Sequence, residues 1–161
     1  MKLFGSFFKR AVLVGGGAMA IAVPFVADWE GLRTSAYLDP VNVPTICYGH
    51  TQGVYIGQEI DRKKCDEMLK EELGEYMAAV DNAVTVPLPD TRLAALASFA
   101  YNVGIGNFRR STLLRKLNAG DTAGACDELR RWVYAKGKKL RGLVRRREAE
   151  RELCLRGLND V

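Results

Sequence analysis

The sequence has one histidine and no two cysteines separated by only two residues, so it lacks the clusters from which zinc sites are built. It contains no internal repeat and no low-complexity stretch, which argues against repeat and disordered architectures. It also has no helix-turn-helix pattern and no aromatic-rich sheet signature of a nucleic-acid-binding module. We therefore expect no metal, no cofactor and no nucleic acid as partner.

The composition of the chain is that of a globular protein. Of its 161 residues 48% are apolar and 27% charged, which suits one domain with two lobes at most. Lysine and arginine number 24 against 19 acidic residues, a formal charge of +5. A basic surface favours a polyanionic partner, and cell-wall polymers and anionic lipids are polyanions too. The alternative is that the basic residues only form solvated helix faces and bind no polyanionic partner.

One long uncharged stretch runs from Ala11 to Ala27, after Lys9 and Arg10. Its length is at the short limit for a membrane-spanning helix, about 17 residues. Positive residues before an apolar segment are typical of an export signal whose N-terminus stays inside. We expect residues 1–28 to form a signal-anchor segment and residues 29–161 to form a folded domain outside the cytoplasm.

Two fates of this segment are open. The Ala-x-Ala steps between residues 18 and 22 would allow cleavage by signal peptidase. The other fate is a retained anchor, and its glycines and alanines make the run only weakly hydrophobic. Such a helix would leave a bilayer comparatively easily.

The cysteines form an even set in the part expected outside the cytoplasm: Cys47, Cys65, Cys126 and Cys154. In an oxidising compartment such a set favours disulfides. Three pairings are possible, of which pairing within each half of the chain closes the shortest loops. Buried free thiols are the alternative.

The pattern along the chain predicts an α+β fold that is mainly α-helical. Turn-forming and β-branched residues from Tyr37 to Ile60 predict a small β-meander. Asp61 is a suitable N-cap for a helix to about Ala83, long enough to join two lobes. After a break that contains two prolines, the periodicity predicts a second half that is all helical, with helices over 90–101, 111–118, 122–134 and 143–155.

Two acidic residues near the start of the expected domain could face each other across a groove. Glu30 ends an apolar helix just after Trp29, and Asp39 lies in the first turn region beside Pro40. Burial raises the pKa of a carboxyl, and exposure leaves it low. We expect Glu30 to be a general acid and Asp39 a water-positioning base, with the Thr45 hydroxyl on the same water. An inverting glycosidase needs such a pair; plain surface charge is the alternative.

Several motifs together resemble the lysozymes of double-stranded DNA phages: Trp29-Glu30-Gly31-Leu32-Arg33, Tyr37-Leu38-Asp39, Thr45-Ile46-Cys47-Tyr48-Gly49-His50, Asn102-Val103-Gly104 with Gly106-Asn107-Phe108, Leu113 to Asn118, Arg131-Trp132, and Gly142-Leu143 with Arg146-Arg147. The resemblance covers nearly everything after Asp28. It implies a lysozyme-like fold. It also implies a muramidase that hydrolyses the β-1,4 bond between N-acetylmuramic acid and N-acetylglucosamine in peptidoglycan and lyses the host cell.

The resemblance assigns roles residue by residue. Glu30 matches the proton donor of the family, Asp39 its second carboxylate and Thr45 its water-orienting hydroxyl. Tyr101 and Ser111 align with positions that line the saccharide cleft, although the helical spacing of Tyr101 also suits a core residue.

Two further features receive no catalytic role. His50 is expected to pack within the β-lobe. The basic run at residues 145–148 is expected to form a solvated helix face or to contact the cell wall.

The family includes signal-anchor-release endolysins, which the host export machinery places in the inner membrane and which are freed into the periplasm when the membrane potential collapses. Resemblance to them implies an anchor through residues 11–27. Single-site chemistry on a small domain needs no oligomer, so we expect a monomer. A spanning helix would leave Glu30 about 4.5 Å beyond Ala27, at the bilayer surface, where no cleft could assemble. No cysteine precedes Trp29, so release should act by refolding alone.

Two other functions remain open. A lytic transglycosylase would use the same glutamate without a water-activating partner, and Asp39 and Thr45 argue against it. A non-enzymatic, membrane-anchored wall-binding module would leave both acids incidental.

Overall fold

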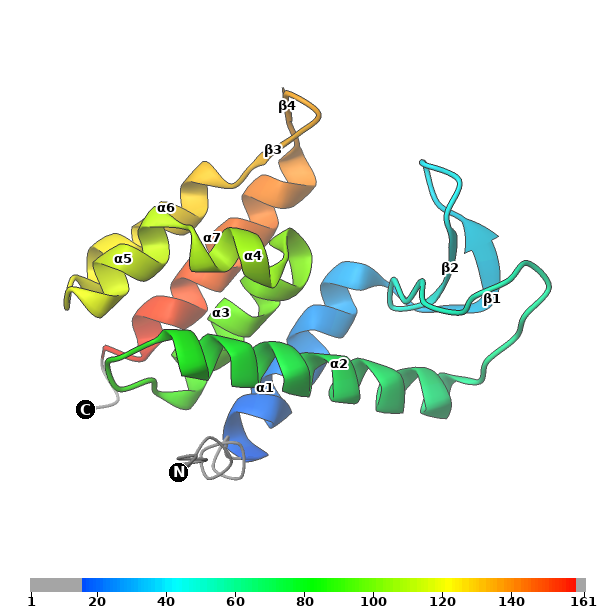
Figure 1. Ribbon diagram of the computed structural model, residues 1–161, viewed down its shortest axis with the longest axis horizontal. Coiled ribbons are helices and arrows are strands. Elements are labelled where there is room, and N and C mark those ends of the chain that lie inside the picture. Colours follow the sequence, from blue (N-terminus) through cyan, green and yellow to red (C-terminus); the bar gives the residue numbers. More distant parts are fainter. Residues whose placement is uncertain (1–15, 159–161) are drawn as a thin grey trace, which may run out of the picture.

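The computed structural model describes residues 16–158. Figure 1 shows a larger helical lobe and a smaller β-lobe, connected by the long helix α2 (Arg62–Ala83) and by the end of α1 (Gly16–Glu30). This arrangement confirms the predicted class, α+β and mainly helical, with a long helix that joins the lobes.

Helix α1 is part of the core of the helical lobe. It packs against α3 (Asp90–Val103) and α2, and the positions that it buries completely recur every four residues, which places them on one face. These positions are Ala18, Ala22 and Val26. Residues 16–28 of the expected anchor thus lie within the folded body, and residues 1–15 lie outside the described residues.

Within residues 16–158, no helix is both long enough and apolar enough to cross a membrane.

The β-lobe is built on an antiparallel pair, β1 (Arg33–Leu38) and β2 (Pro44–Cys47). A third segment joins β1 through backbone hydrogen bonds, among them Ala36 N to Gln58 O at 2.9 Å. The predicted meander therefore begins four residues before Tyr37, and its third strand is reduced to one isolated bridge, between Ser35 and Glu59.

Helix α2 begins and ends where the sequence predicts. The side chain of Asp61 accepts a hydrogen bond from the backbone N–H of Lys64 at 2.8 Å, as an N-cap does. The helix stops at Ala83, before the two prolines. Its buried face consists of Cys65, Leu69, Leu73, Met77 and Val80.

The helical lobe surrounds α3, which is buried almost throughout. The other elements are α4 (Ile105–Arg109), α5 (Thr112–Asn118), α6 (Thr122–Glu128), a short 3-10 helix (Leu129–Arg131) and α7 (Arg141–Arg156). The helices predicted over 90–101, 111–118 and 143–155 are confirmed as α3, α5 and α7, with shifts of one or two residues at their ends.

The helix predicted over 122–134 is confirmed only to Glu128: a 3-10 helix follows over Leu129–Arg131, and a hairpin begins at Tyr134. Strand β3 (Tyr134–Ala135) pairs with β4 (Lys138–Lys139). The two residues between them have positive φ, 49° at Lys136 and 75° at Gly137, the geometry of a two-residue turn that matches strand twist. The second half is therefore not all helical.

The four cysteines form two disulfides, one in each half of the chain. Cys47–Cys65 ties β2 to the start of α2, and Cys126–Cys154 ties α6 to α7. Of the possible pairings, the protein has the one that closes the shortest loops.

Candidate active site

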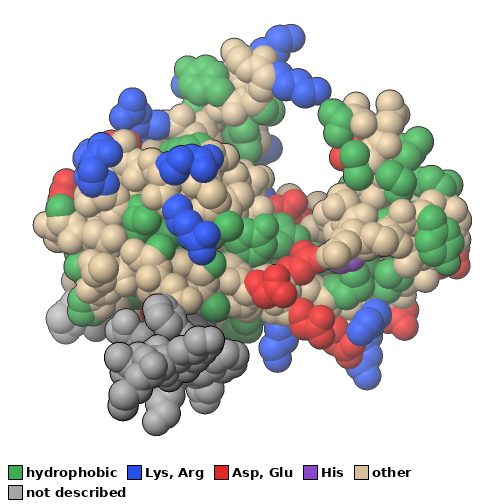
Figure 2. All heavy atoms as spheres, in the orientation of Figure 1, with side chains coloured by type: hydrophobic (Ala, Val, Ile, Leu, Met, Phe, Trp, Pro, Cys, Tyr) green, Lys and Arg blue, Asp and Glu red, His purple; other side chains and the backbone are tan. Residues whose placement is uncertain are grey.

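A cleft of about 400 Å³ lies between the two lobes. Figure 2 shows the molecule hollowed there, with acidic side chains and the single histidine along its floor. The lining residues come from α1, the loop after β2, α2 and α3; they are Glu30, Tyr48, Gly49, His50, Thr51, Gln52, Glu72, Glu75, Tyr76, Tyr101 and Asn102.

Glu30 reaches this cleft because it is the last residue of α1. The next residue, Gly31, has φ of 71°, and its N–H bonds to Ala27 O at 3.0 Å. A glycine at positive φ ends a helix without the strain of a Cβ, and the chain turns from here into β1. The Glu30 side chain is 21% exposed, so its carboxylate is accessible from the cleft.

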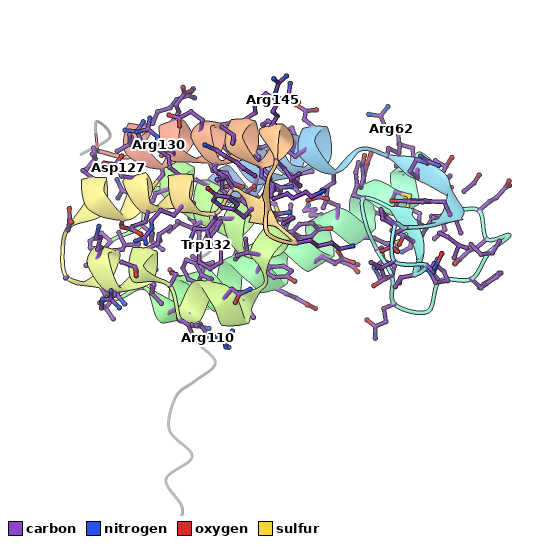
Figure 3. The ribbon with its side chains drawn as sticks, turned by 90° about the horizontal axis from the view of Figure 1, so that it is seen from above. Arg62, Arg110, Asp127, Arg130, Trp132 and Arg145 are labelled. Carbon is purple, nitrogen blue, oxygen red and sulfur yellow. A yellow bond between two sulfur atoms is a disulfide. The ribbon has the colours of Figure 1, made fainter. Side chains whose placement is uncertain are left out.

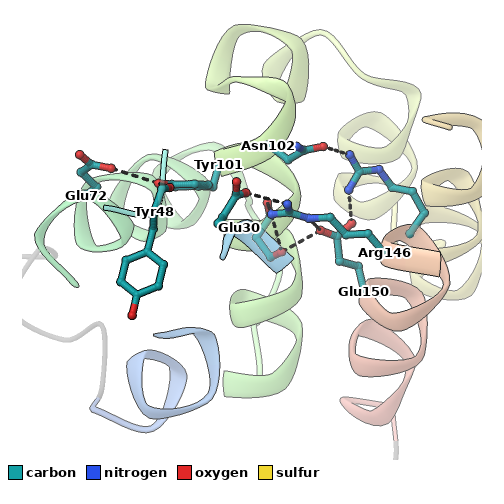
Figure 4. Close-up of polar contacts among 9 residues, drawn as sticks. Glu30, Tyr48, Glu72, Tyr101, Asn102, Arg146 and Glu150 are labelled. Carbon is teal, nitrogen blue, oxygen red and sulfur yellow. Dashed lines mark hydrogen bonds and ion pairs between the residues drawn. The ribbon is translucent and has the colours of Figure 1, made fainter. Parts of the chain in front are cut away.

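Arg146 holds the Glu30 carboxylate from behind. Arg146 Nη1 lies 2.7 Å from Glu30 Oε1, and the Arg146 side chain is only 5% exposed. Glu30 Oε2 is on the side of Gly49, where a Cβ would lie 3.8 Å away. One oxygen is thus anchored by the guanidinium while the other is near the cleft wall, as Figure 4 shows for the anchored side.

A buried ionic network supports Arg146 in turn. Glu150 is fully buried and accepts hydrogen bonds from Arg146 Nε at 3.1 Å, Ser98 Oγ at 2.7 Å and Arg147 Nη1 at 2.6 Å. Arg147 also contacts the Asn102 side chain. Burial lowers the pKa of the Arg147 guanidinium, and the charge of Glu150 opposes that change.

The expected solvated face at residues 145–148 is therefore wrong for two of its members. Arg146 and Arg147 are buried, while Arg145 is exposed. The reason is that Arg146 and Arg147 lie on the inner face of α7, where both form ion pairs with Glu150 one turn later. Side chains three or four residues apart on a helix are neighbours on its surface.

Tyr101 links three elements at the other wall of the cleft. Its hydroxyl lies 2.9 Å from the carbonyl oxygen of Tyr48 and 3.2 Å from Glu72 Oε2. Burial, followed by the charge of Glu72, raises the pKa of Tyr101. This residue of α3 thus connects the helical lobe to the loop after β2 and to α2 (Figure 4).

His50 is also bound to α2. Its Nδ1 is in close contact with Glu72 Oε1, and its Nε2 lies 3.0 Å from Gln52 O. The sequence placed His50 within the β-lobe alone, but the structure makes it part of the connection between that lobe and the long helix.

Asp39 and Thr45 lie on the β1–β2 hairpin, and neither is among the residues that line the cleft. Asp39 Oδ1 accepts hydrogen bonds from the backbone N–H groups of Val41 at 2.9 Å and Val43 at 2.8 Å. The buried Thr45 donates its hydroxyl proton to Val43 O at 2.9 Å. Both side chains are therefore held in place by the turn that joins the two strands.

Ser111 is the N-cap of α5. Its hydroxyl accepts from Leu114 N at 3.1 Å and donates to Phe108 O at 2.7 Å, and the residue is buried. Of the two expected saccharide-binding residues, the structure thus places Tyr101 in the cleft and Ser111 at a helix start outside the lining set.

Sequence reasoning missed Glu72, Arg146 and Glu150. The four-residue spacing between Arg146 and Glu150 was a usable signal, but nothing in the sequence says which acid an arginine on another helix will face. Among residues 16–158, no cluster of histidine, cysteine and acidic side chains could hold a metal ion.

Comparison with known proteins identifies a family to which this chain is similar. The family model described as phage lysozyme matches residues 27–150. A SAR-endolysin of Enterobacteria phage PA-2 is 45% identical over 154 residues, which are 91% of this chain and 93% of the relative.

Solved structures agree with this match. A P22 lysozyme mutant superposes with a TM-score of 0.76 at 35% identity, over 84% of this chain and 96% of that one. The active form of the P1 phage endolysin Lyz gives 0.79 at 25% identity, over 89% and 85% of the two chains. The secreted inactive form of Lyz covers 92% and 96%, yet gives only 0.51, at 21% identity.

Proposed function

The chain belongs to the phage lysozyme family, as an endolysin of the SAR type, and from this premise we propose that Glu30 is the general acid of its glycan hydrolysis. Membership makes the chain a lysozyme-type glycoside hydrolase whose substrate is peptidoglycan. The observation that carries the proposal is the position of Glu30: an accessible carboxylate in the cleft between the lobes, fixed by Arg146.

The bond cleaved is the β-1,4 bond between N-acetylmuramic acid and N-acetylglucosamine. Glu30 gives its proton to the leaving glycosidic oxygen, and a water attacks the opposite face of the sugar ring, as inverting glycosidases require. Asp39 accepts a proton from that water, and the Thr45 hydroxyl orients it. Support for this division comes from the hairpin that follows Glu30 directly and carries both residues in fixed positions. Hydrolysis of this bond lyses the host cell.

The products of the reaction test the proposal. Purified peptidoglycan is digested with the parent protein, with Glu30→Gln and with Glu75→Gln, and the soluble fragments are analysed by mass spectrometry. Glu75 lines the same cleft, so its variant is a matched control for loss of one charge there. We expect reducing muramic ends from the parent and from Glu75→Gln, and none from Glu30→Gln.

Other products would contradict the proposal. Anhydro-muramic ends would make the protein a lytic transglycosylase. Equal digestion by Glu30→Gln would remove Glu30 from the chemistry, and a parent that binds peptidoglycan without releasing fragments would be a wall-binding module.

We further propose that the protein is held inactive at the inner membrane before it acts. The host export machinery inserts residues 11–27, the domain faces the periplasm, and loss of the membrane potential frees the segment, so that residues 16–27 fold as part of α1. The protein then acts as a monomer in the periplasm. Support comes from the burial of α1 beside α3 and from the greater similarity of the fold to the active form of Lyz than to its inactive form.

A further inference from the structure

A second cavity, of about 330 Å³, lies beside the cleft, and the proposed reaction does not use it. Its walls include Trp132, Tyr134 and Leu143, with the amides of Asn102 and Asn107. Asn102 lines the catalytic cleft as well. The second cavity is therefore a neighbour of the cleft on the helical lobe, and it reaches the β3–β4 hairpin through Tyr134 and Ala135.

The aromatic floor of this cavity is held rigidly. The ring of Trp132 packs edge to face on Phe99, with 5.3 Å between centroids. The backbone carbonyl of Trp132 accepts a hydrogen bond from Arg147 Nε at 3.0 Å. Arg147 also contacts Asn102. The buried network behind Glu30 thus fixes the floor of the second cavity too. Trp132 is half-buried, and in Figure 3 it lies among the helices of the helical lobe.

Tyr134 also lines this cavity and is far more accessible than Trp132. It lies on β3 and is 61% exposed, although it is a large apolar side chain. A rigid aromatic floor, an exposed aromatic wall and two amides combine the stacking faces and hydrogen-bonding groups that an amphipathic sugar ring can use.

The hairpin also concentrates positive charge next to this wall. Lys136, Lys138 and Lys139 are all exposed, within four residues of one another. In Figure 2 the basic side chains of the hairpin overhang the hollow between the lobes. Such a group of ammonium ions attracts carboxylates.

We propose that this second cavity and the hairpin form an extended binding site for the glycan strand and its peptide stems. An N-acetylated sugar beyond the cleft stacks between Trp132 and Tyr134, and hydrogen-bonds to Asn102 and Asn107. The free carboxylates of the stem peptides pair with the lysines of the hairpin. The inference rests on the proposed muramidase function, because it extends the same substrate out of the same cleft.

A membrane surface is a weaker match for these groups. Anionic lipid would satisfy the lysines, but it would leave unused a cavity that shares Asn102 with the cleft. A continuous polymer with rings and carboxylates uses both parts at once.

Binding to soluble wall fragments tests the aromatic wall. Glu30→Gln is the background, so that fragments are not cleaved, and Tyr134→Ala is compared with Tyr55→Ala, because Tyr55 in the β-lobe is 63% exposed. We expect Tyr134→Ala to raise Kd for glycan fragments about fivefold, and Tyr55→Ala to leave it unchanged. With Glu30 restored, Tyr134→Ala should raise KM and keep kcat, the signature of lost uniform binding. Equal Kd values for both variants would overturn the aromatic site.

Removal of the peptide stems tests the lysines. The double variant Lys138→Ala/Lys139→Ala is compared with Lys63→Ala/Lys70→Ala, which removes two exposed lysines from α2. We expect only the hairpin variant to bind stem-bearing fragments about tenfold more weakly, and to bind amidase-treated, stem-free strands as its parent does. Unchanged affinity for stem-bearing fragments would overturn this part of the proposal.

Two controls separate this inference from its alternatives. If hairpin lysines are needed for binding to phosphatidylglycerol vesicles but not to fragments, the hairpin is a membrane contact and the proposal fails. The proposed function is judged independently, by reducing ends from the unaltered protein, so a failed hairpin test leaves the muramidase intact.

Discussion

Arg146 connects the candidate acid to the buried interior of the helical lobe. It bonds Glu30 on one side and Glu150 on the other, and Glu150 is completely buried. Removal of one partner from such a group leaves charge without compensation in a place that water does not reach. Arg146 therefore both supports the fold and orients the carboxylate of Glu30.

We predict that Arg146→Met lowers the free energy of unfolding by about 3–5 kcal/mol and lowers kcat as well, because Glu30 loses its anchor. Arg145→Met is the matched control: it alters the exposed neighbour and should change stability by less than about 0.5 kcal/mol. Urea unfolding and assays on purified peptidoglycan provide the two readouts. Equal stability of the two variants would contradict the structural role of the network.

The variant Asp39→Asn removes the negative charge of residue 39 while its side chain keeps the same position. Asparagine keeps an Oδ1 that can accept from Val41 N and Val43 N, so the turn should persist while the base is lost. We predict a fall in kcat of roughly 10²-fold to 10⁴-fold with unfolding free energy unchanged. Asp61→Asn, a change at a helix N-cap, should leave kcat as it is. A kcat of Asp39→Asn near that of the parent would exclude Asp39 as the base.

The sequence identifies these residues unevenly. Glu30 and Tyr101 could be predicted for the cleft from a helix end and a resemblance, because both depend on local position. The partners of Glu30 could not, since Arg146 lies on the last helix and the pairing arises only when α7 packs on α3. Ser111 shows the reverse problem: alignment indicates a saccharide contact, while the local sequence also suits the N-cap that the structure contains.

At the scale of elements, α5 and α6 are joined by one partly buried carboxylate. Glu128 accepts a hydrogen bond from Lys116 Nζ at 2.7 Å and also pairs with Arg131. The hydrogen bond from Lys116 is the largest reason that the pKa of Glu128 is lowered. A lowered folded-state pKa means that the stabilising contribution is present above the unfolded value and is lost as pH falls through the folded value.

We therefore predict that Glu128→Gln costs about 1 kcal/mol at pH 7, a modest figure because Lys116 is 38% exposed and water screens the pair. The difference from the parent should shrink below about pH 4.3, the ordinary value for a glutamate, and vanish in stronger acid. Glu67→Gln, at an exposed pair with Lys64, should have little effect at either pH. Urea unfolding at pH 7 and pH 3 measures both; a difference that grows in acid would contradict the assigned direction.

Elements with strong local signals were predictable. An N-cap aspartate and two prolines define α2, and the disulfide loops are short. The β3–β4 hairpin was not predicted, because each strand has two residues and no period can be read from them. Only the Lys136-Gly137 turn pointed to it, and that turn lies inside a sequence otherwise compatible with a helix.

At the scale of the whole molecule, the proposed release from the membrane places two structural requirements on the segment that contains α1. Weak hydrophobicity suits a helix that leaves a bilayer, and small side chains suit a helix that packs closely on α3. Alanines satisfy both: Ala18 and Ala22 are completely buried, whereas Ala20 on the same helix is exposed. The sequence predicts the first requirement, while the second depends on a packing partner more than sixty residues away.

We predict that Ala22→Leu and Ala20→Leu differ in their effects, although both add the same apolar surface to the segment. Only Ala22→Leu overpacks the core against α3, which should cost about 1–3 kcal/mol in the folded domain. After the membrane potential is collapsed, Ala22→Leu should delay lysis more than Ala20→Leu does. Equal delays would mean that membrane affinity alone controls release and that docking of α1 does not contribute.

The proposal that the anchoring segment becomes the helix that carries the catalytic acid is tested most directly by the N-terminus of the active enzyme. Soluble protein is isolated from the periplasm of cells at the onset of lysis, its intact mass is measured, and its activity on peptidoglycan is recorded. We predict that the active protein retains residues 16–28, because one face of α1 buries Ala18, Ala22 and Val26 in the core. Fully active protein whose N-terminus lies at or beyond Val23 would contradict the proposal.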